Sequence, residues 1–165
     1  MNLDDFIREL DDIGTFENGK AIIPICVDFD GTIVEHEYPK IGKENKHCFE
    51  VMRKFSELYN VGWILDTMRP SKLCKEAVKF IEEHGIKLYG IGREPNQRNW
   101  TDTPKAYGIF SIDDRNIGVP LIHEKGKRPY VDWKKVEEIL ERAKKQEITT
   151  ISFCDHNVVR GVRRN

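Results

Sequence analysis

Residues 21–32 read AIIPICVDFDGT, an apolar run that ends in two aspartates and a glycine. The stretch from Ala21 to Phe29 is apolar on both faces, which is typical of a central strand in a parallel sheet. Side chains alternate along a strand, so we expect the carboxylates of Asp28 and Asp30 to project to one side while Phe29 points into the core. Gly31 allows the chain to turn sharply directly afterwards.

The rest of the chain alternates between helical and strand-like patterns. This alternation predicts an α/β fold, a three-layer Rossmann-like parallel sheet with helices on both faces. At 165 residues the chain is long enough for one ordinary domain and short for two. We therefore expect a single domain over residues 1–165, with a short N-terminal helix in 1–17, a motif core at 21–118 and a C-terminal helix and tail at 132–165. Further strands are predicted at 63–65, 86–91, 109–112 and 148–153, helices around 49–58, from 70 to 85 and from 132, and a short helical turn from 103.

Polar residues follow the predicted strands at the ends where parallel sheets bind ligands. Two carboxylates that project into the same site repel each other, so one tends to hold a proton while the other stays ionised. Attack by a carboxylate on a dianionic phosphate is opposed by Coulomb repulsion, which a metal ion and a lysine can offset. The residues at these ends are Asp28, Asp30, Asp66, Thr67, Asp113 and Asp114, and Lys105 lies just before the strand predicted at 109–112.

The order of these motifs resembles the haloacid dehalogenase-like (HAD) phosphohydrolases over residues 21–118. The matching elements are Asp-Phe-Asp-Gly-Thr from Asp28, an apolar strand ending at Thr67, then Lys105, then Ile-Asp-Asp ending at Asp114. Asp66 departs from the pattern, because an apolar residue usually precedes the motif threonine, and its role stays open.

The resemblance implies a magnesium-dependent phosphatase that hydrolyses a phosphate monoester through an aspartyl-phosphate intermediate. Asp28 would attack phosphorus, and Asp30 would protonate the leaving group and then activate water. Thr67 and Lys105 would hold phosphoryl oxygens. Mg²⁺ would bind the Asp28 carboxylate, the backbone carbonyl of Asp30 and Asp113, with Asp114 as an alternative ligand.

Neither interval between the motifs has room for a cap domain. Residues 31–46 form only a flap and residues 92–102 only a loop, so we expect a capless or minimally capped enzyme with an open site. Its substrate would be a phosphorylated macromolecule, or a phosphorylated small molecule enclosed by a neighbouring subunit of a homo-oligomer.

Arg69 is a candidate clamp for a substrate anion or else faces solvent. Trp100 is a candidate for the substrate pocket or else a packed tryptophan.

The charge balance excludes a general attraction to nucleic acid or anionic membranes, because 27 Lys and Arg residues face 28 Asp and Glu residues, a net charge of -1. A solvated end is the preferred interpretation of the C-terminal arginines Arg160, Arg163 and Arg164. Two alternatives stay open for the function. One is a phosphoacceptor domain, and the other is a non-catalytic binding module that contacts nucleic acid through this tail.

The cysteines and the start of the chain bear on the cellular compartment. Four scattered cysteines show no zinc-ligand spacing, so reduced thiols are expected. The N-terminus is acidic, and no apolar run approaches the length of a membrane span. We therefore expect a soluble cytoplasmic protein without a membrane partner.

Overall fold

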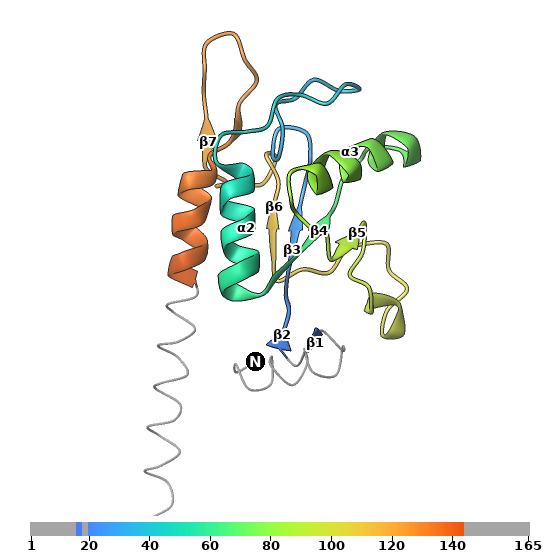
Figure 1. Ribbon diagram of the computed structural model, residues 1–165. Helices are drawn as coiled ribbons and strands as arrows, with labels where there is room; N and C mark the ends of the chain where they lie inside the picture. Colours follow the sequence, from blue (N-terminus) through green and yellow to red (C-terminus); the bar gives the residue numbers. More distant parts are fainter. Residues whose placement is uncertain (1–15, 18–19, 144–165) are drawn as a thin grey trace, which may run out of the picture.

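Figure 1 shows the computed structural model of the chain, which describes residues 16–17 and 20–143. Two short antiparallel strands, β1 (Phe16–Glu17) and β2 (Lys20–Ala21), precede the main sheet. Residues 16–17 are therefore a strand and not the end of the predicted N-terminal helix. The rest of that helix, the strand predicted at 148–153 and the arginine-rich tail lie outside the described residues.

Four parallel strands form the central sheet in the order β5-β4-β3-β6. Val27 pairs with Leu65 on one side and with Ile112 on the other, and Leu65 pairs with Ile91. The four strands therefore end at the same level, which is the edge where ligands bind in such sheets. The predicted α/β fold is confirmed. The strands are β3 (Ile23–Val27), β4 (Val61–Leu65), β5 (Gly90–Ile91) and β6 (Phe110–Ile112).

The predicted long helices are present: α2 (Cys48–Tyr59), α3 (Ser71–Glu83) and a helix over 133–143. Gly85 has a φ of 80° just after α3, a conformation that glycine adopts without strain. The carboxylate of Asp132 accepts a hydrogen bond from the backbone N–H of Lys135 at 3.3 Å and caps the last helix, as its position predicts. The helical turn predicted from 103 is wrong, because the chain turns instead in a 3₁₀ helix at Gln97–Asn99.

One hydrophobic core joins the sheet to these helices. It contains side chains from β3, β4 and β6 together with side chains from α2, α3 and helix 133–143. Trp63 of β4 donates its indole N–H to the carbonyl of Met52 at 3.1 Å, and its ring meets that of Trp133 edge to face at 6.2 Å. Burying each large apolar side chain stabilises the fold by about 1.5–3 kcal/mol. The core therefore ties the last described helix to the first half of the chain.

A hairpin that the sequence does not predict follows β6. Its strands are β7 (Leu121–Ile122) and β8 (Tyr130–Val131). The N–H of Val131 donates to the carbonyl of Gly31 at 3.0 Å, and Lys127 forms an ion pair with Glu35 at 2.8 Å. Figure 1 shows the hairpin and the flap of residues 31–46 projecting beyond the same end of the sheet. The carboxyl ends of the strands therefore lie near two connected loops.

Two further expectations concern cysteines and membranes. Cys26, Cys48 and Cys74 are free thiols, and burial raises the pKa of Cys26 to about 11. Within residues 20–143, no helix combines the length and the apolar character needed to cross a bilayer.

Candidate metal centre

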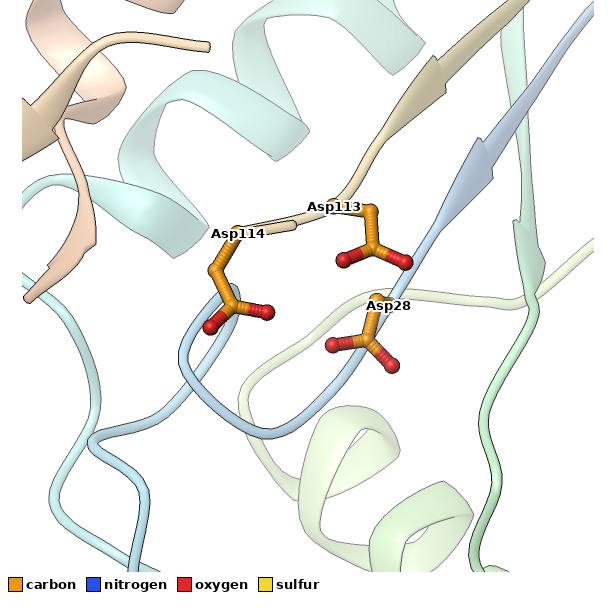
Figure 2. A group of neighbouring side chains, drawn as sticks. All are labelled: Asp28, Asp113 and Asp114. Carbon is orange, nitrogen blue, oxygen red and sulfur yellow. The ribbon is translucent and has the colours of Figure 1, made fainter. Parts of the chain in front are cut away.

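Three aspartates from two distant segments of the sequence meet at the carboxyl ends of β3 and β6. Asp28, Asp113 and Asp114 each offer one oxygen, and these oxygens lie within 4.8 Å of one another (Figure 2). The backbone N–H of Asp28 donates to the carbonyl of Ile112 at 3.0 Å, which holds the two strand ends together. Clustered carboxylates are the donor set that Mg²⁺ prefers. The structure thus brings together the side-chain ligands that the sequence predicts from two segments.

Thr32 connects the two segments that carry these acids. Its side chain is fully buried. The hydroxyl donates to the carboxylate of Asp28 at 3.4 Å and accepts the backbone N–H of Asp114 at 3.0 Å. The carbonyl of Thr32 accepts hydrogen bonds from the side chains of Asn45 and Trp133, both at 2.8 Å. These four hydrogen bonds, together with one from the backbone N–H of Thr32 to the carbonyl of Phe29 at 3.3 Å, fix Thr32 so that it positions the acids on either side.

Gly31 brings the first motif into direct contact with the second. Its φ is +84°, and a Cβ added there would lie 2.6 Å from Oδ2 of Asp114. A side chain at position 31 would therefore be strained by the backbone conformation and would also push Asp114 away. The turn glycine is required for the close approach of the two acidic segments.

Asp30 lies outside the three-carboxylate group and is bound by Arg69 instead. The guanidinium donates from Nε to one carboxylate oxygen at 2.7 Å and from Nη2 to the other at 2.6 Å. The side chain of Arg69 is only 1% exposed, and its guanidinium lies against the rings of Phe29 and Tyr38 at 4.9 and 5.4 Å. Arg69 is therefore neither a solvent-facing arginine nor a free clamp for substrate, because Asp30 already occupies it.

Burial is the main cause of the unusual protonation of Asp28, whose pKa is raised from 3.8 to about 7. A hydrogen bond from the backbone N–H of Phe29 acts in the opposite direction, and repulsion by Asp113, Asp114 and Asp30 raises the pKa further. A divalent cation among these carboxylates would favour the ionised form of Asp28. The charge distribution therefore suits a site that is completed by a cation.

The two neighbouring aspartates after β6 differ in their partners. Burial works to raise the pKa of Asp113, but hydrogen bonds from the backbone and side chain of Arg115 lower it overall. These bonds run from the Arg115 N–H to Oδ1 at 2.8 Å and from Nη2 to Oδ2 at 3.3 Å. The pKa of Asp114 is raised, first by burial and then by repulsion from Asp113. Asp113 is thus the aspartate whose ionised form the protein stabilises.

A cavity of about 350 Å³ opens beside the cluster. A larger hollow of about 560 Å³ lies beside Asn60 and Gly85 at the amino end of β4, and none of the predicted site residues lines it. Chemistry and not size selects the smaller cavity, which we call the acidic cavity. It is lined by Asp28, Asp30, His36, Tyr38, Thr67, Met68, Arg69, Asp114, Arg115 and Arg128.

The other predicted site residues divide into those inside and those outside the acidic cavity. Thr67 lines it, and its hydroxyl oxygen accepts the backbone N–H of Arg69 at 3.3 Å. Lys105 and Trp100 are exposed and are not among the lining residues. The Trp100 ring instead meets that of Tyr107 edge to face at 5.4 Å. Asp66 lies outside the lining as well, although burial and then Asp113 raise its pKa.

Five lining residues are absent from the sequence-based prediction: His36, Tyr38, Met68, Arg115 and Arg128. Arg115 directly follows the aspartate pair, so its position after a predicted strand was a usable signal. His36 and Arg128 lie in the flap and in the hairpin, where no pattern marks them. Thr32, although part of the quoted motif, was not predicted to have a role of its own.

The fold and this cluster define an α/β protein with a candidate divalent-cation site at the carboxyl edge of its sheet. No protein-family model matches the sequence, and no curated protein matches it. Among solved structures, the chain is similar to a conserved protein from Bacteroides thetaiotaomicron, with 30% sequence identity and a TM-score of 0.61. The match covers 74% of this chain and 92% of that one. The chain belongs to the same family as that conserved Bacteroides protein.

Proposed function

We propose that the protein is a magnesium-dependent phosphohydrolase that cleaves phosphate monoesters through an aspartyl-phosphate on Asp28. The observation that carries the proposal is the meeting of Asp28 with Asp113 and Asp114 at one point, beside Asp30 and Thr67. Ordered carboxylates, a hydroxyl and cations around one cavity are the groups that phosphoryl transfer requires. The resemblance of the motif order to HAD phosphohydrolases points to the same reaction.

The donor set fits a hard divalent cation. The three groups are carboxylates, with no cysteine or histidine in the cluster, and oxygen ligands favour Mg²⁺ over softer metals. Asp28, Asp113 and Asp114 would hold the ion. Its charge would offset the repulsion between the Asp28 carboxylate and the phosphoryl oxygens.

The chain's own residues supply the remaining steps. An oxygen of Asp28 forms a bond to phosphorus while the bond from phosphorus to the ester oxygen breaks, and Asp30 donates a proton to that leaving oxygen. A water molecule then attacks the phosphorus, Asp30 accepts its proton, and the bond to Asp28 breaks. Arg69 orients Asp30 beside the acidic cavity through two hydrogen bonds, one to each carboxylate oxygen, so one of these bonds must open when Asp30 carries the proton.

Thr67 is suited to hold a phosphoryl oxygen. Its hydroxyl oxygen already accepts the backbone N–H of Arg69, which leaves the hydroxyl hydrogen free to donate. This arrangement gives the phosphoryl group one neutral donor in the acidic cavity.

Hydrolysis of p-nitrophenyl phosphate by the full chain tests the proposal. We expect many turnovers per molecule with Mg²⁺, none with excess EDTA, and none for Asp28→Asn with its fold retained by circular dichroism. Asp102→Asn is the matched control, because it makes the same chemical change at an exposed position outside the acidic cavity. Release of one equivalent only would favour the phosphoacceptor alternative. Turnover by Asp28→Asn at the wild-type rate would exclude Asp28 as the nucleophile.

A further inference from the structure

Three arginines line the acidic cavity, and they differ in how far they are already engaged. Arg69 is buried and bound to Asp30 through both carboxylate oxygens. Arg115 binds the carboxylate of Asp113. Arg128 is exposed, and among residues 20–143 no hydrogen bond or ion pair holds its guanidinium. Its charge opposes the burial and the repulsion from Asp113 that raise the pKa of Asp114, so it acts on the cluster while remaining available.

The hairpin that carries Arg128 is firmly attached to the flap. Lys127, the preceding residue, forms ion pairs with Glu35 at 2.8 Å and with Glu124 at 3.2 Å. The hydroxyl of Tyr130 donates to Glu124 at 2.7 Å. Arg128 therefore extends from a backbone that is fixed on both sides, so an anion that binds its side chain does not also have to order the hairpin backbone.

Lys105, the cation that the motif order predicts, does not reach this cavity. The N–H of Ile109 donates to the carbonyl of Pro24 at 2.8 Å, so the chain enters β6 level with Pro24, four residues before Asp28. At about 3.3 Å per strand residue, this level is about 13 Å from the carboxyl edge. Lys105 precedes this point in the chain and is not among the cavity's lining residues. The positive charge for a phosphoryl group must come from another residue.

The formal charges leave Arg128 as the unbalanced cation. Arg69 neutralises Asp30, and Arg115 neutralises Asp113. A divalent cation would neutralise Asp28 and Asp114. Arg128 then gives the acidic cavity a net positive charge, and its planar fork of N–H donors matches the oxygens of a phosphoryl group.

We propose that Arg128 is a substrate-binding residue that holds the non-bridging oxygens of the phosphoryl group, in the role that the sequence assigns to Lys105. This inference rests on the proposed function and identifies the group of the substrate that the hairpin recognises. It also makes the hairpin part of the site, so the open cavity obtains one wall from a segment that follows all the motifs.

The test compares Arg128→Ala with Lys105→Ala in the full chain. For p-nitrophenyl phosphate with Mg²⁺, we expect Arg128→Ala to raise KM by roughly 10- to 100-fold, the range for losing a charge-assisted hydrogen-bonding partner. Arg128→Lys should raise KM less than Arg128→Ala does, because lysine keeps the positive charge but lacks the planar guanidinium donors. We expect Lys105→Ala to stay within about twofold of wild type. Lys125→Ala is the matched control, since Lys125 is exposed on the same hairpin and does not line the cavity.

Binding of inorganic phosphate in the presence of Mg²⁺, measured by calorimetry, separates this inference from the proposed function. If the wild type shows no turnover but binds phosphate, and Arg128→Ala weakens that binding, the hydrolase proposal fails and the assignment of Arg128 stands. An unchanged KM and unchanged phosphate affinity in Arg128→Ala would overturn the assignment. A larger loss in Lys105→Ala, or a wild type that binds no phosphate, would overturn it as well.

Discussion

The guanidinium of Arg69 holds both carboxylate oxygens of Asp30, at 2.7 and 2.6 Å, although the two residues are 39 positions apart. The same guanidinium donates to the carbonyls of Pro39 and Lys40, at 3.0 and 2.7 Å. One buried side chain therefore joins the first acidic motif, the segment after β4 and the flap. The relationship is structural and electrostatic at once, because it fixes the orientation of Asp30 and supplies its counter-charge.

Removing Arg69 is expected to destabilise the fold. Arg69→Ala leaves the partly buried carboxylate of Asp30 without its partner, and such losses cost about 3–5 kcal/mol of unfolding free energy. Urea unfolding of Arg69→Ala, Asp30→Asn and the double variant measures the coupling. We expect the double variant to be clearly more stable than the sum of the two single losses predicts. Strictly additive losses would mean that the ion pair does not couple the two segments.

Gly31→Ala should disturb the metal centre beyond its backbone cost. The matched control is Gly118→Ala, because Gly118 has the same φ of +84° but has no atom within 4 Å of an added Cβ. In both variants an alanine must adopt a left-handed conformation, which lowers the free energy of unfolding by an amount of the order of 1 kcal/mol. Only Gly31→Ala places a methyl group against Asp114. Calorimetric titration with Mg²⁺ should show weakened binding for Gly31→Ala and wild-type binding for Gly118→Ala, and equal affinities would contradict the close approach.

Asp28→Asn should stabilise the metal-free protein at high pH. The pKa of Asp28 is about 7 in the folded protein, compared with an ordinary value of 3.8. Between pH 3.8 and pH 7 the folded state therefore holds a proton on Asp28 that the unfolded state has lost. Stability is therefore lost as the pH rises from about 4 to about 7, and a neutral asparagine avoids this loss. In EDTA we expect the variant to unfold a few degrees above wild type at pH 8, with a smaller difference at pH 5. A difference that does not depend on pH would argue against the raised pKa.

Thr32→Val should weaken metal binding although Thr32 is not a ligand. Valine has a similar shape but removes the hydroxyl that contacts the Asp28 carboxylate and the Asp114 backbone. Loss of such a supporting partner lowers metal affinity by roughly 10- to 100-fold. Thr32→Ser keeps the hydroxyl and should bind Mg²⁺ much more tightly than Thr32→Val. Equal affinities for the two variants in the same titration would show that the Thr32 hydroxyl does not support metal binding.

The central strands and the acidic cluster could be predicted from the sequence because both depend on local pattern. Runs such as Ile25–Val27 and Trp63–Leu65 are apolar on both faces, which is typical of strands in a covered parallel sheet. Once the strands are known, their carboxyl ends must meet at one edge, so Asp28 and Asp113 could be placed together. The third predicted strand is shorter than expected, because only Gly90 and Ile91 pair with β4.

The hairpin and the roles of the arginines could not be predicted, because they depend on contacts between distant segments. The strands of the hairpin are two residues each, too short to show alternation, and they are held by contacts with Gly31 and Glu35. A long side chain such as that of Arg69 can reach several partners, and spacing along the chain does not select one. Lys105 was placed at the start of a helix that does not form.

The anchoring of Thr32 has a consequence for synthesis of the protein. Its carbonyl accepts the indole N–H of Trp133, 101 residues further along the chain. Domains begin to fold while the ribosome is still extending them. A nascent chain released before Trp133 would contain every aspartate of the cluster and still lack one of the two side chains that secure the loop between them, so the site can be completed only after Trp133 has been synthesised.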